Sequence, residues 1–142
     1  MEIEGYRLPD DLYYHKEHFW AKVEGNSVLV GTTDFAQKLA GQIVYVELPS
    51  AGKTVEQGKP CGSMDSGKWV GRIYAPVSGK VESVNEALED SPEFINDSPY
   101  EKGWMIKVSP SNLQEELKNL MQGQSVKDFI KSEIVRIKKT KE

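Results

Sequence analysis

The chain has 142 residues, enough for one ordinary domain with a hydrophobic core. Its formal net charge of −4 provides no basic surface for nucleic acid, and its single cysteine, Cys61, excludes an intramolecular disulfide. No apolar run is long enough to span a bilayer, and the first residues lack the pattern of a signal peptide. We therefore expect a cytoplasmic protein with no nucleic acid and no membrane among its partners.

A β-hairpin is predicted after a mixed segment of residues 1–13. Aromatic and β-branched residues fill a first strand from Tyr14 to Val23, and Val28–Gly31 form its partner. Residues 24–27 between them have the composition of a turn.

A short helix follows the hairpin. Asp34 is the predicted N-cap, Gln37 stands in the capping-box position, and Gly41 ends the helix. Phe35 and Leu39 are four residues apart, so we expect them to be buried together.

A second predicted hairpin displays a lysine. Lys59–Met64 and Val70–Ala75 are two extended segments, and the residues between them form a turn that contains glycine. This arrangement places Lys68 near the tip. Gly67 can adopt backbone angles that other residues resist, which suits a rigid turn.

Two similar segments flank this lysine hairpin. Gly41–Val46 and Gly79–Val84 share a glycine, a β-branched residue two positions later and a valine at the end, and each leads to a further strand that opens on Gly58 or Gly103. Two similar half-folds with a lysine turn at their junction resemble lipoyl and biotinyl carrier domains. The resemblance implies a mainly β fold: a lipoyl/biotinyl-carrier-like flattened β sandwich (barrel-sandwich hybrid) with peripheral short helices and C-terminal helices.

The C-terminal part is predicted to be helical. After an irregular insertion of residues 86–99, Trp104–Val108 is the last strand, and Ser111 is expected to cap a helix. A second helix after Gly123 carries an apolar stripe, interpreted as core, that consists of Val126, Phe129, Ile130, Ile134 and Ile137. We thus divide the chain into an N-terminal segment (1–13), a lipoyl-carrier β domain (14–109) and a C-terminal helical segment (110–142).

Several motifs occur in a fixed order between Tyr14 and about Ile130. They are His18-Phe19-Trp20, Gly31–Gln37, Ile43–Pro49, Tyr74–Gly79, Val84–Leu88, and Ile95–Tyr100 followed by Gly103-Trp104. In this order and at this spacing they resemble the H protein family of the glycine cleavage system, whose members are lipoylated shuttles.

The resemblance implies a non-catalytic carrier. Lys68 would be the attachment site of lipoate, held covalently as N6-lipoyllysine, and Asp65, Ser66, Gly67 and Trp69 would form the turn that is recognised. An aminomethyl group would pass from glycine decarboxylase (P protein) to aminomethyltransferase (T protein), with lipoamide dehydrogenase (L protein) and lipoate-attaching enzymes as further partners. We expect a monomer with no catalytic residue and no metal.

The match is weakest around the lysine itself. The family usually reads Glu-Ser-Val-Lys-Ala-(Val or Ala)-Ser-(Asp or Glu), whereas this chain has Trp69 for the alanine, Gly71 for the serine and Arg72 for the final acid. Because Arg72 reverses a charge close to the lysine, an alternative stays open. The chain could be an H-like lipoate-binding protein that carries sulfur intermediates for a heterodisulfide-reductase-like sulfur-oxidation complex.

Other classes of function have less support. An enzyme would need a nucleophile with a base, for which Cys61 and His18 are the candidate pair. His15 and His18 are too few to complete a metal site with soft ligands. A biotin carrier normally has methionines beside its lysine, where this chain has Gly67 and Trp69. An unmodified structural or regulatory protein would show no mass added to Lys68.

Overall fold

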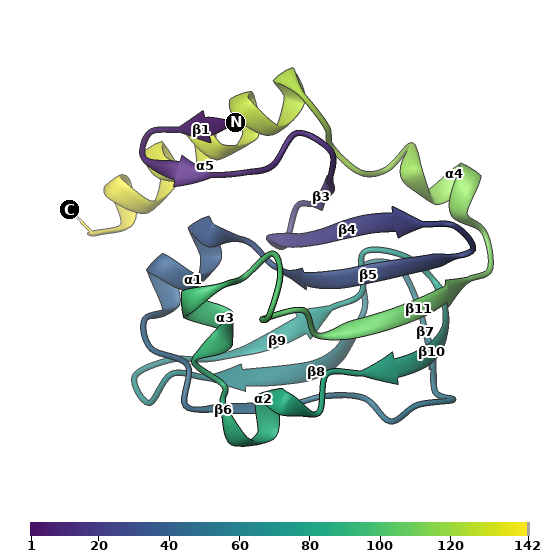
Figure 1. Ribbon diagram of the computed structural model, residues 1–142. Helices are drawn as coiled ribbons and strands as arrows, with labels where there is room; N and C mark the ends of the chain where they lie inside the picture. The colour runs from purple at the N-terminus through teal and green to yellow at the C-terminus, as the bar shows by residue number, and fades with distance from the viewer. Residues whose placement is uncertain (142) are drawn as a thin grey trace.

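The computed structural model describes residues 1–141, and the side chains of residues 1–138. The last residue of the predicted C-terminal segment lies outside the described residues. Two β-sheets face each other, and an N-terminal hairpin and a long C-terminal helix lie together over one end of the larger sheet (Figure 1). The prediction of a mainly β sandwich with peripheral helices is confirmed.

The larger sheet has the strand order β3-β4-β5-β11-β10-β7, and the smaller one has the order β6-β8-β9. The larger sheet contains β3 (Tyr13–His15), β4 (Phe19–Glu24), β5 (Ser27–Thr32), β7 (Thr54–Val55), β10 (Gly79–Val84) and β11 (Ile106–Pro110). The smaller sheet contains β6 (Tyr45–Glu47), β8 (Pro60–Asp65) and β9 (Val70–Tyr74). The helices are α1 (Asp34–Ala40), α2 (Ala87–Asp90), α3 (Phe94–Asp97), α4 (Leu113–Leu117) and α5 (Gln124–Lys141).

The main core lies between the two sheets. Alternate residues of a strand point to opposite faces, so each strand sends every second side chain inward. Ala21, Val28 and Val30 of the larger sheet and Met64 and Ile73 of the smaller sheet belong to one buried cluster. The β8–β9 hairpin is therefore fixed to the body by its inner face, while its turn projects from the end of the sandwich (Figure 1).

A second buried cluster joins the two ends of the chain to the larger sheet. The first residues form a small hairpin of β1 (Glu2–Ile3) and β2 (Tyr6–Arg7), which the sequence did not predict. Val126 and Ile130 of α5 pack in this cluster with Trp20 and Phe35, and the other residues of the predicted stripe pack against it. The interpretation of that stripe as core is confirmed.

The predicted strand from Tyr14 to Val23 is wrong as a continuous element. β3 ends at His15 and β4 begins at Phe19, because the chain turns between them and the backbone amide of His18 donates to the carbonyl of His15 (2.9 Å). His18 has a positive φ of 69°, a conformation that few residues other than glycine adopt. This turn brings His18 to one end of the sandwich.

The predicted start and packing of α1 are also partly wrong. Thr33, not Asp34, is the N-cap, since its hydroxyl accepts a hydrogen bond from the amide of Ala36 (3.1 Å). Phe35 is buried, but Leu39 is 41% exposed. The two residues are not buried together, because Leu39 lines an open cleft.

Further element boundaries differ from the prediction, among them the last strand, which was expected at Trp104–Val108 and is β11 at Ile106–Pro110. The strand expected from Ile43 to Leu48 is only β6, because the backbone amide of Ile43 donates to the side chain of Asn96 (2.8 Å). Ser111 does not cap α4; Asn112 is its N-cap residue and forms no side-chain capping hydrogen bond.

Candidate functional site

The β8–β9 turn is held by local hydrogen bonds. Asp65 lies opposite Val70 in the register, and the backbone amide of Ser66 donates to the carbonyl of Trp69 (2.9 Å). The Asp65 carboxylate accepts a hydrogen bond from the amide of Gly67 (2.7 Å), as in an Asx turn. Gly67 has a φ of +88°, so a side chain at this position would be strained. The local sequence therefore specifies a single turn geometry.

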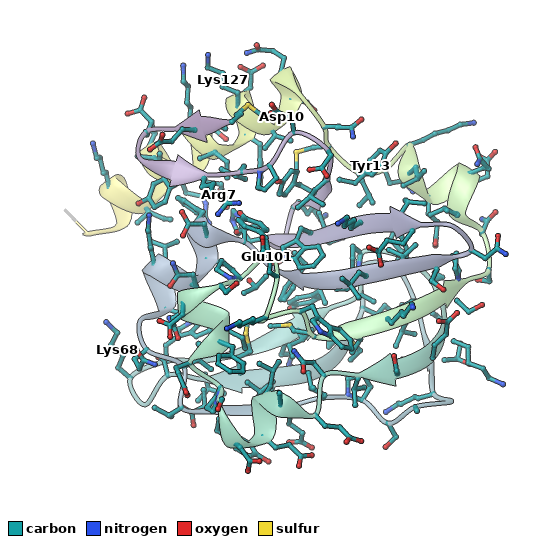
Figure 2. All side chains as sticks on the ribbon, viewed as in Figure 1. Arg7, Asp10, Tyr13, Lys68, Glu101 and Lys127 are labelled. Carbon is teal, nitrogen blue, oxygen red and sulfur yellow. The ribbon has the colours of Figure 1, made fainter. Side chains whose placement is uncertain are left out.

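Lys68 lies at the tip of this turn with its side chain exposed. Figure 2 shows the side chain extending from the end of the sandwich, and no hydrogen bond or ion pair joins Lys68 to another described residue. Its methylene chain passes close to Gly41, which follows α1: a Cβ added there would lie 2.8 Å from Lys68 Cε and 3.2 Å from Nζ. The amine is thus accessible from outside.

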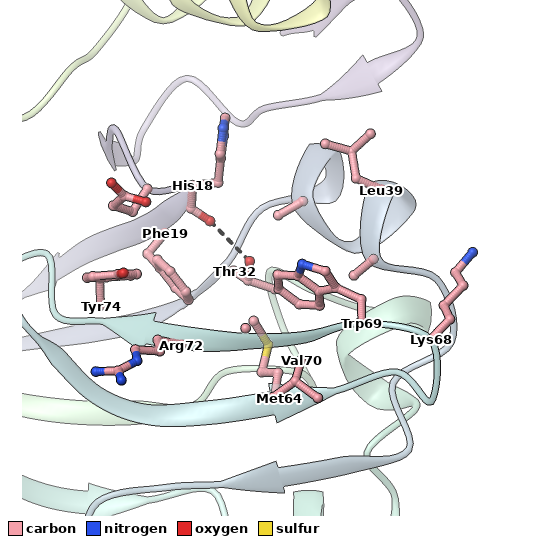
Figure 3. A pocket seen from close by; sticks show the side chains of 14 residues that line it. His18, Phe19, Thr32, Leu39, Met64, Lys68, Trp69, Val70, Arg72 and Tyr74 are labelled. Carbon is pink, nitrogen blue, oxygen red and sulfur yellow. Dashed lines mark hydrogen bonds between the residues drawn. The ribbon is translucent and has the colours of Figure 1, made fainter. Parts of the chain in front are cut away.

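A cleft of about 520 Å³ opens beside the turn, along β9, which is an edge strand of the smaller sheet (Figure 3). One wall comes from the turn between β3 and β4, and a second wall from α1. The third wall is β9 with its preceding turn. The lining residues are Glu17, His18, Phe19, Thr32, Ala36, Leu39, Ala40, Met64, Lys68, Trp69, Val70, Gly71, Arg72 and Tyr74. Most of this lining is apolar, and Glu17 and Arg72 carry opposite charges.

Trp69 packs its indole directly on the backbone of Gly71. A Cβ at Gly71 would lie 2.0 Å from Trp69 Cη2 and 2.2 Å from Cζ2, so only glycine permits this position of the ring. The indole also lines a small inner cavity of about 20 Å³ between α1, α3 and β8. Trp69 therefore lines both this cavity and the open cleft.

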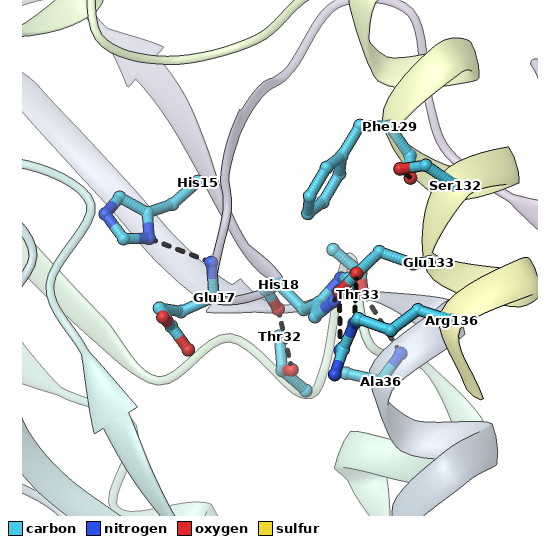
Figure 4. A network of polar contacts seen from close by, with 10 residues as sticks. All are labelled: His15, Glu17, His18, Thr32, Thr33, Ala36, Phe129, Ser132, Glu133 and Arg136. Carbon is cyan, nitrogen blue, oxygen red and sulfur yellow. Dashed lines mark hydrogen bonds and ion pairs between the residues drawn. The ribbon is translucent and has the colours of Figure 1, made fainter. Parts of the chain in front are cut away.

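A polar network braces the cleft wall that carries His18 (Figure 4). The imidazole Nε2 of His18 lies 2.7 Å from a carboxylate oxygen of Glu133 on α5, and the ring packs between Phe35 and Phe129. Burial lowers the pKa of His18 although Glu133 opposes this effect, while hydrogen bonds from Arg136 and His18 hold the pKa of Glu133 below its usual value. A neutral His18 that donates from Nε2 fits these contacts. Its Nδ1 is buried and has no hydrogen-bond partner among the described residues.

Burial makes Cys61 a poor nucleophile. It lies half-buried on β8, and burial raises the pKa of its thiol to about 11. The thiolate form, which is the reactive one, is therefore disfavoured. Among the described residues, no cluster of three or more His, Cys, Asp or Glu side chains could hold a metal ion. No described helix has the length and apolar content needed to cross a membrane.

The structure brings the five sequence-predicted site residues, 65–69, together on one turn. Sequence reasoning missed most of the cleft that adjoins them, including Leu39, Met64 and Tyr74. These residues come from different elements and share no sequence pattern. The one available signal was the pair of departures from the family pattern at Trp69, just before β9, and at Gly71 within β9.

Three comparisons with known proteins agree with one another. Residues 12–133 match the family described as Glycine cleavage H-protein. The chain is 52% identical to the "Glycine cleavage system H protein" of Halalkalibacterium halodurans over 126 residues, which cover 89% of this chain and 98% of that protein. It is 51% identical to the "Probable glycine cleavage system H protein" of Pyrococcus abyssi over 133 residues, which cover 93% and 98%. Among solved structures, a glycine cleavage system H protein from Mycobacterium marinum superposes with a TM-score of 0.75 at 35% identity, covering 83% of this chain and 94% of that one.

Proposed function

The chain belongs to the glycine cleavage H-protein family, and from this premise we propose that it is a carrier of the glycine cleavage system, with Lys68 as the site where lipoate is attached. The observation that supports the site most strongly is the exposed Lys68 side chain at the tip of a turn fixed by Asp65 and Gly67. The relatives favour glycine cleavage over the alternative of a sulfur carrier.

The residues around Lys68 fit a lipoyl group. The amine lies in the open, where a lipoate-attaching enzyme can reach it, and it forms no ion pair with a described residue that would have to be broken first. Acylation would join the amine nitrogen to the carboxyl carbon of lipoate, with loss of one amine proton and of the group that activates the carboxyl. The adjoining cleft is mostly apolar, and its volume is in the range that proteins use for small ligands.

The lipoyl group and the protein chain would have separate roles. When attached, the lipoyl group supplies a disulfide that accepts the aminomethyl group through one sulfur and later releases it. The chain itself holds the attachment point on a rigid turn, so that the flexible part begins at the Lys68 side chain. Tethering converts delivery between two enzymes into a local search at a raised effective concentration.

The partners that follow are enzymes of the same system. We propose that a pyridoxal-phosphate-dependent glycine decarboxylase loads the carrier, an aminomethyltransferase unloads it and lipoamide dehydrogenase reoxidises it. No chemical step is assigned to the chain's own side chains, and the raised pKa of Cys61 agrees with that assignment. The chain is thus a non-catalytic component.

A loading assay tests this function. The lipoylated chain is incubated with glycine decarboxylase and glycine labelled at its methylene carbon, and the label bound to protein is counted. We expect one equivalent of label on the wild type and none on Lys68→Arg, which keeps the charge and cannot form the same amide. Lys80→Arg, an exposed lysine on β10, is the matched control and should load normally. Equal labelling of Lys68→Arg and wild type would overturn the proposal.

A further inference from the structure

The indole of Trp69 lies between Lys68 and the interior of the cleft. Figure 3 shows the Lys68 side chain pointing away from the cleft, with Trp69 standing between it and the positions of Met64 and Thr32. A chain attached to the Lys68 amine that folds back toward the cleft therefore passes the indole first.

The indole is packed on one side and open on the other. It is 44% exposed, an unusual amount of open aromatic surface for a tryptophan, and its inner face rests on Gly71. The indole also lines the small cavity together with Ala36, Met64 and Ile95. The structure thus maintains a flat aromatic face at the mouth of the cleft, directly after the lysine in the sequence.

We propose that Trp69 is a positioning residue for the lipoyl arm, meaning the Lys68 side chain extended by lipoate, and that the arm rests on the outer face of the indole in its uncharged disulfide form. This inference rests on the proposed function. The arm has a run of methylene groups and a disulfide, and both gain apolar contact on an aromatic face, where sulfur atoms pack favourably. Gly71 serves this role indirectly, because it lets the ring lie flat against β9.

The contact with Trp69 would shift the equilibrium of the arm between a seated and an extended position. An arm seated on Trp69 shields its disulfide from solvent, and an arm extended from the turn exposes it. If about four-fifths of the arms are seated, an external reductant reacts about fivefold more slowly than with a free arm. Removing the indole would shift the arm toward the extended position.

Tryptophan emission reports this contact directly, because a disulfide in contact with an indole quenches its emission. The contribution of Trp69 is the difference between wild type and Trp69→Phe, measured with the unmodified and the lipoylated chain. Trp20 is fully buried in the second cluster and Trp104 packs against it, and the same subtraction removes the emission of both. We expect lipoylation to reduce the Trp69 contribution by about half or more, as direct contact requires, and reduction of the disulfide to restore it.

The second measurement is the rate at which a water-soluble phosphine reduces the arm's disulfide. Trp69→Ala should raise this rate several-fold, Trp69→Phe should raise it less, and Val23→Ala, an exposed apolar residue outside the cleft, should leave it unchanged. Circular dichroism checks that each variant is folded. An unchanged Trp69 emission on lipoylation, or an unchanged or slower reduction in Trp69→Ala, would overturn the inference.

The two proposals fail in different ways. An intact-mass spectrum without a lipoyl group on Lys68 contradicts the proposed function. A chain that is lipoylated and loads normally, but whose Trp69 emission and reduction rate do not respond, contradicts only the role of Trp69.

Discussion

Gly71→Ala would place a methyl group 2.0 Å from Trp69 Cη2, where carbon atoms in contact are separated by about 3.5 to 4 Å. The backbone of Gly71 does not have a positive φ, so alanine itself fits the strand. The indole must therefore move, and the two positions should be energetically coupled. A double-mutant cycle with Trp69→Ala measures this coupling.

The magnitude follows from the buried area. The indole is 44% exposed, so about 100 Å² of its apolar surface is covered, which corresponds to about 2.5 kcal/mol. If the new methyl group displaces the indole from about half of that contact, Gly71→Ala lowers the free energy of unfolding by about 1 kcal/mol. Alanine is also more favourable than glycine in a strand, which raises the free energy of unfolding by up to about 1 kcal/mol. In the Trp69→Ala background there is no indole to displace, so Gly71→Ala only gains the stabilisation of alanine over glycine. We expect a coupling energy of about 1 kcal/mol.

Urea unfolding followed by circular dichroism gives the free energies of unfolding of the wild type, the two single variants and the double variant. Coupling near 1 kcal/mol exceeds the scatter of about 0.3 to 0.5 kcal/mol found for independent sites. Gly123→Ala is the control for the cycle: its positive φ gives alanine a cost there, but no atom lies within 4 Å of the added Cβ, so this cost should be additive with that of Trp69→Ala. Additivity of Gly71→Ala with Trp69→Ala within that scatter would show that the indole does not rest on Gly71.

Three further predictions concern the supports of the site. Burial lowers the pKa values of His15 and His18, so the unfolded chain binds protons near pH 6.5 before the folded chain does, and stability should fall as the pH drops from about 6.5 toward 5. His18→Asn, which tolerates the positive φ, should remove the His18 part of this slope in urea titrations and leave the His15 part. Asp65→Ala removes the acceptor for the Gly67 amide and should slow lipoylation of Lys68 several-fold at a stability cost of about 1 kcal/mol, whereas Asp65→Asn keeps an acceptor; equal rates for both variants would contradict this role of the turn. The Asn96 side-chain amide donates to Gly41 O (2.8 Å), and Asn96→Asp would place a carboxylate against that carbonyl. The free energy of unfolding, measured by chemical denaturation, should fall by about 2 to 4 kcal/mol, and a fall below about 0.5 kcal/mol would contradict the contact.

The lysine turn could be predicted because its signals are local, whereas the sandwich was expected from the resemblance to lipoyl and biotinyl carrier domains. The turn residues Asp65 and Gly67, between one short segment that ends at Met64 and another that contains Val70 and Ile73, indicate a hairpin without reference to the rest of the chain. The strand from Tyr14 to Val23 was predicted to be continuous because nothing local marks His18 as a turn residue. Its positive φ depends on tertiary contacts with Phe35, Phe129 and Glu133.

The cleft could not be predicted for the same reason. Leu39 has the spacing of a core residue on α1, yet it faces an opening whose other wall is β9, some thirty residues later in the chain. The N-terminal hairpin was missed because strands of two residues leave almost no periodic pattern, and its packing depends on α5 at the other end of the chain.

The most direct test of Lys68 as the attachment site is peptide mass mapping. The chain is first incubated with a lipoate-attaching enzyme, ATP and lipoate. We expect a single lipoyl group, on the peptide that contains Lys68, and no modification of Lys59, which precedes β8, or of Lys80 on β10. A lipoyl group on another lysine, or a Lys68 peptide that stays unmodified while a known H protein is modified in the same mixture, would contradict it.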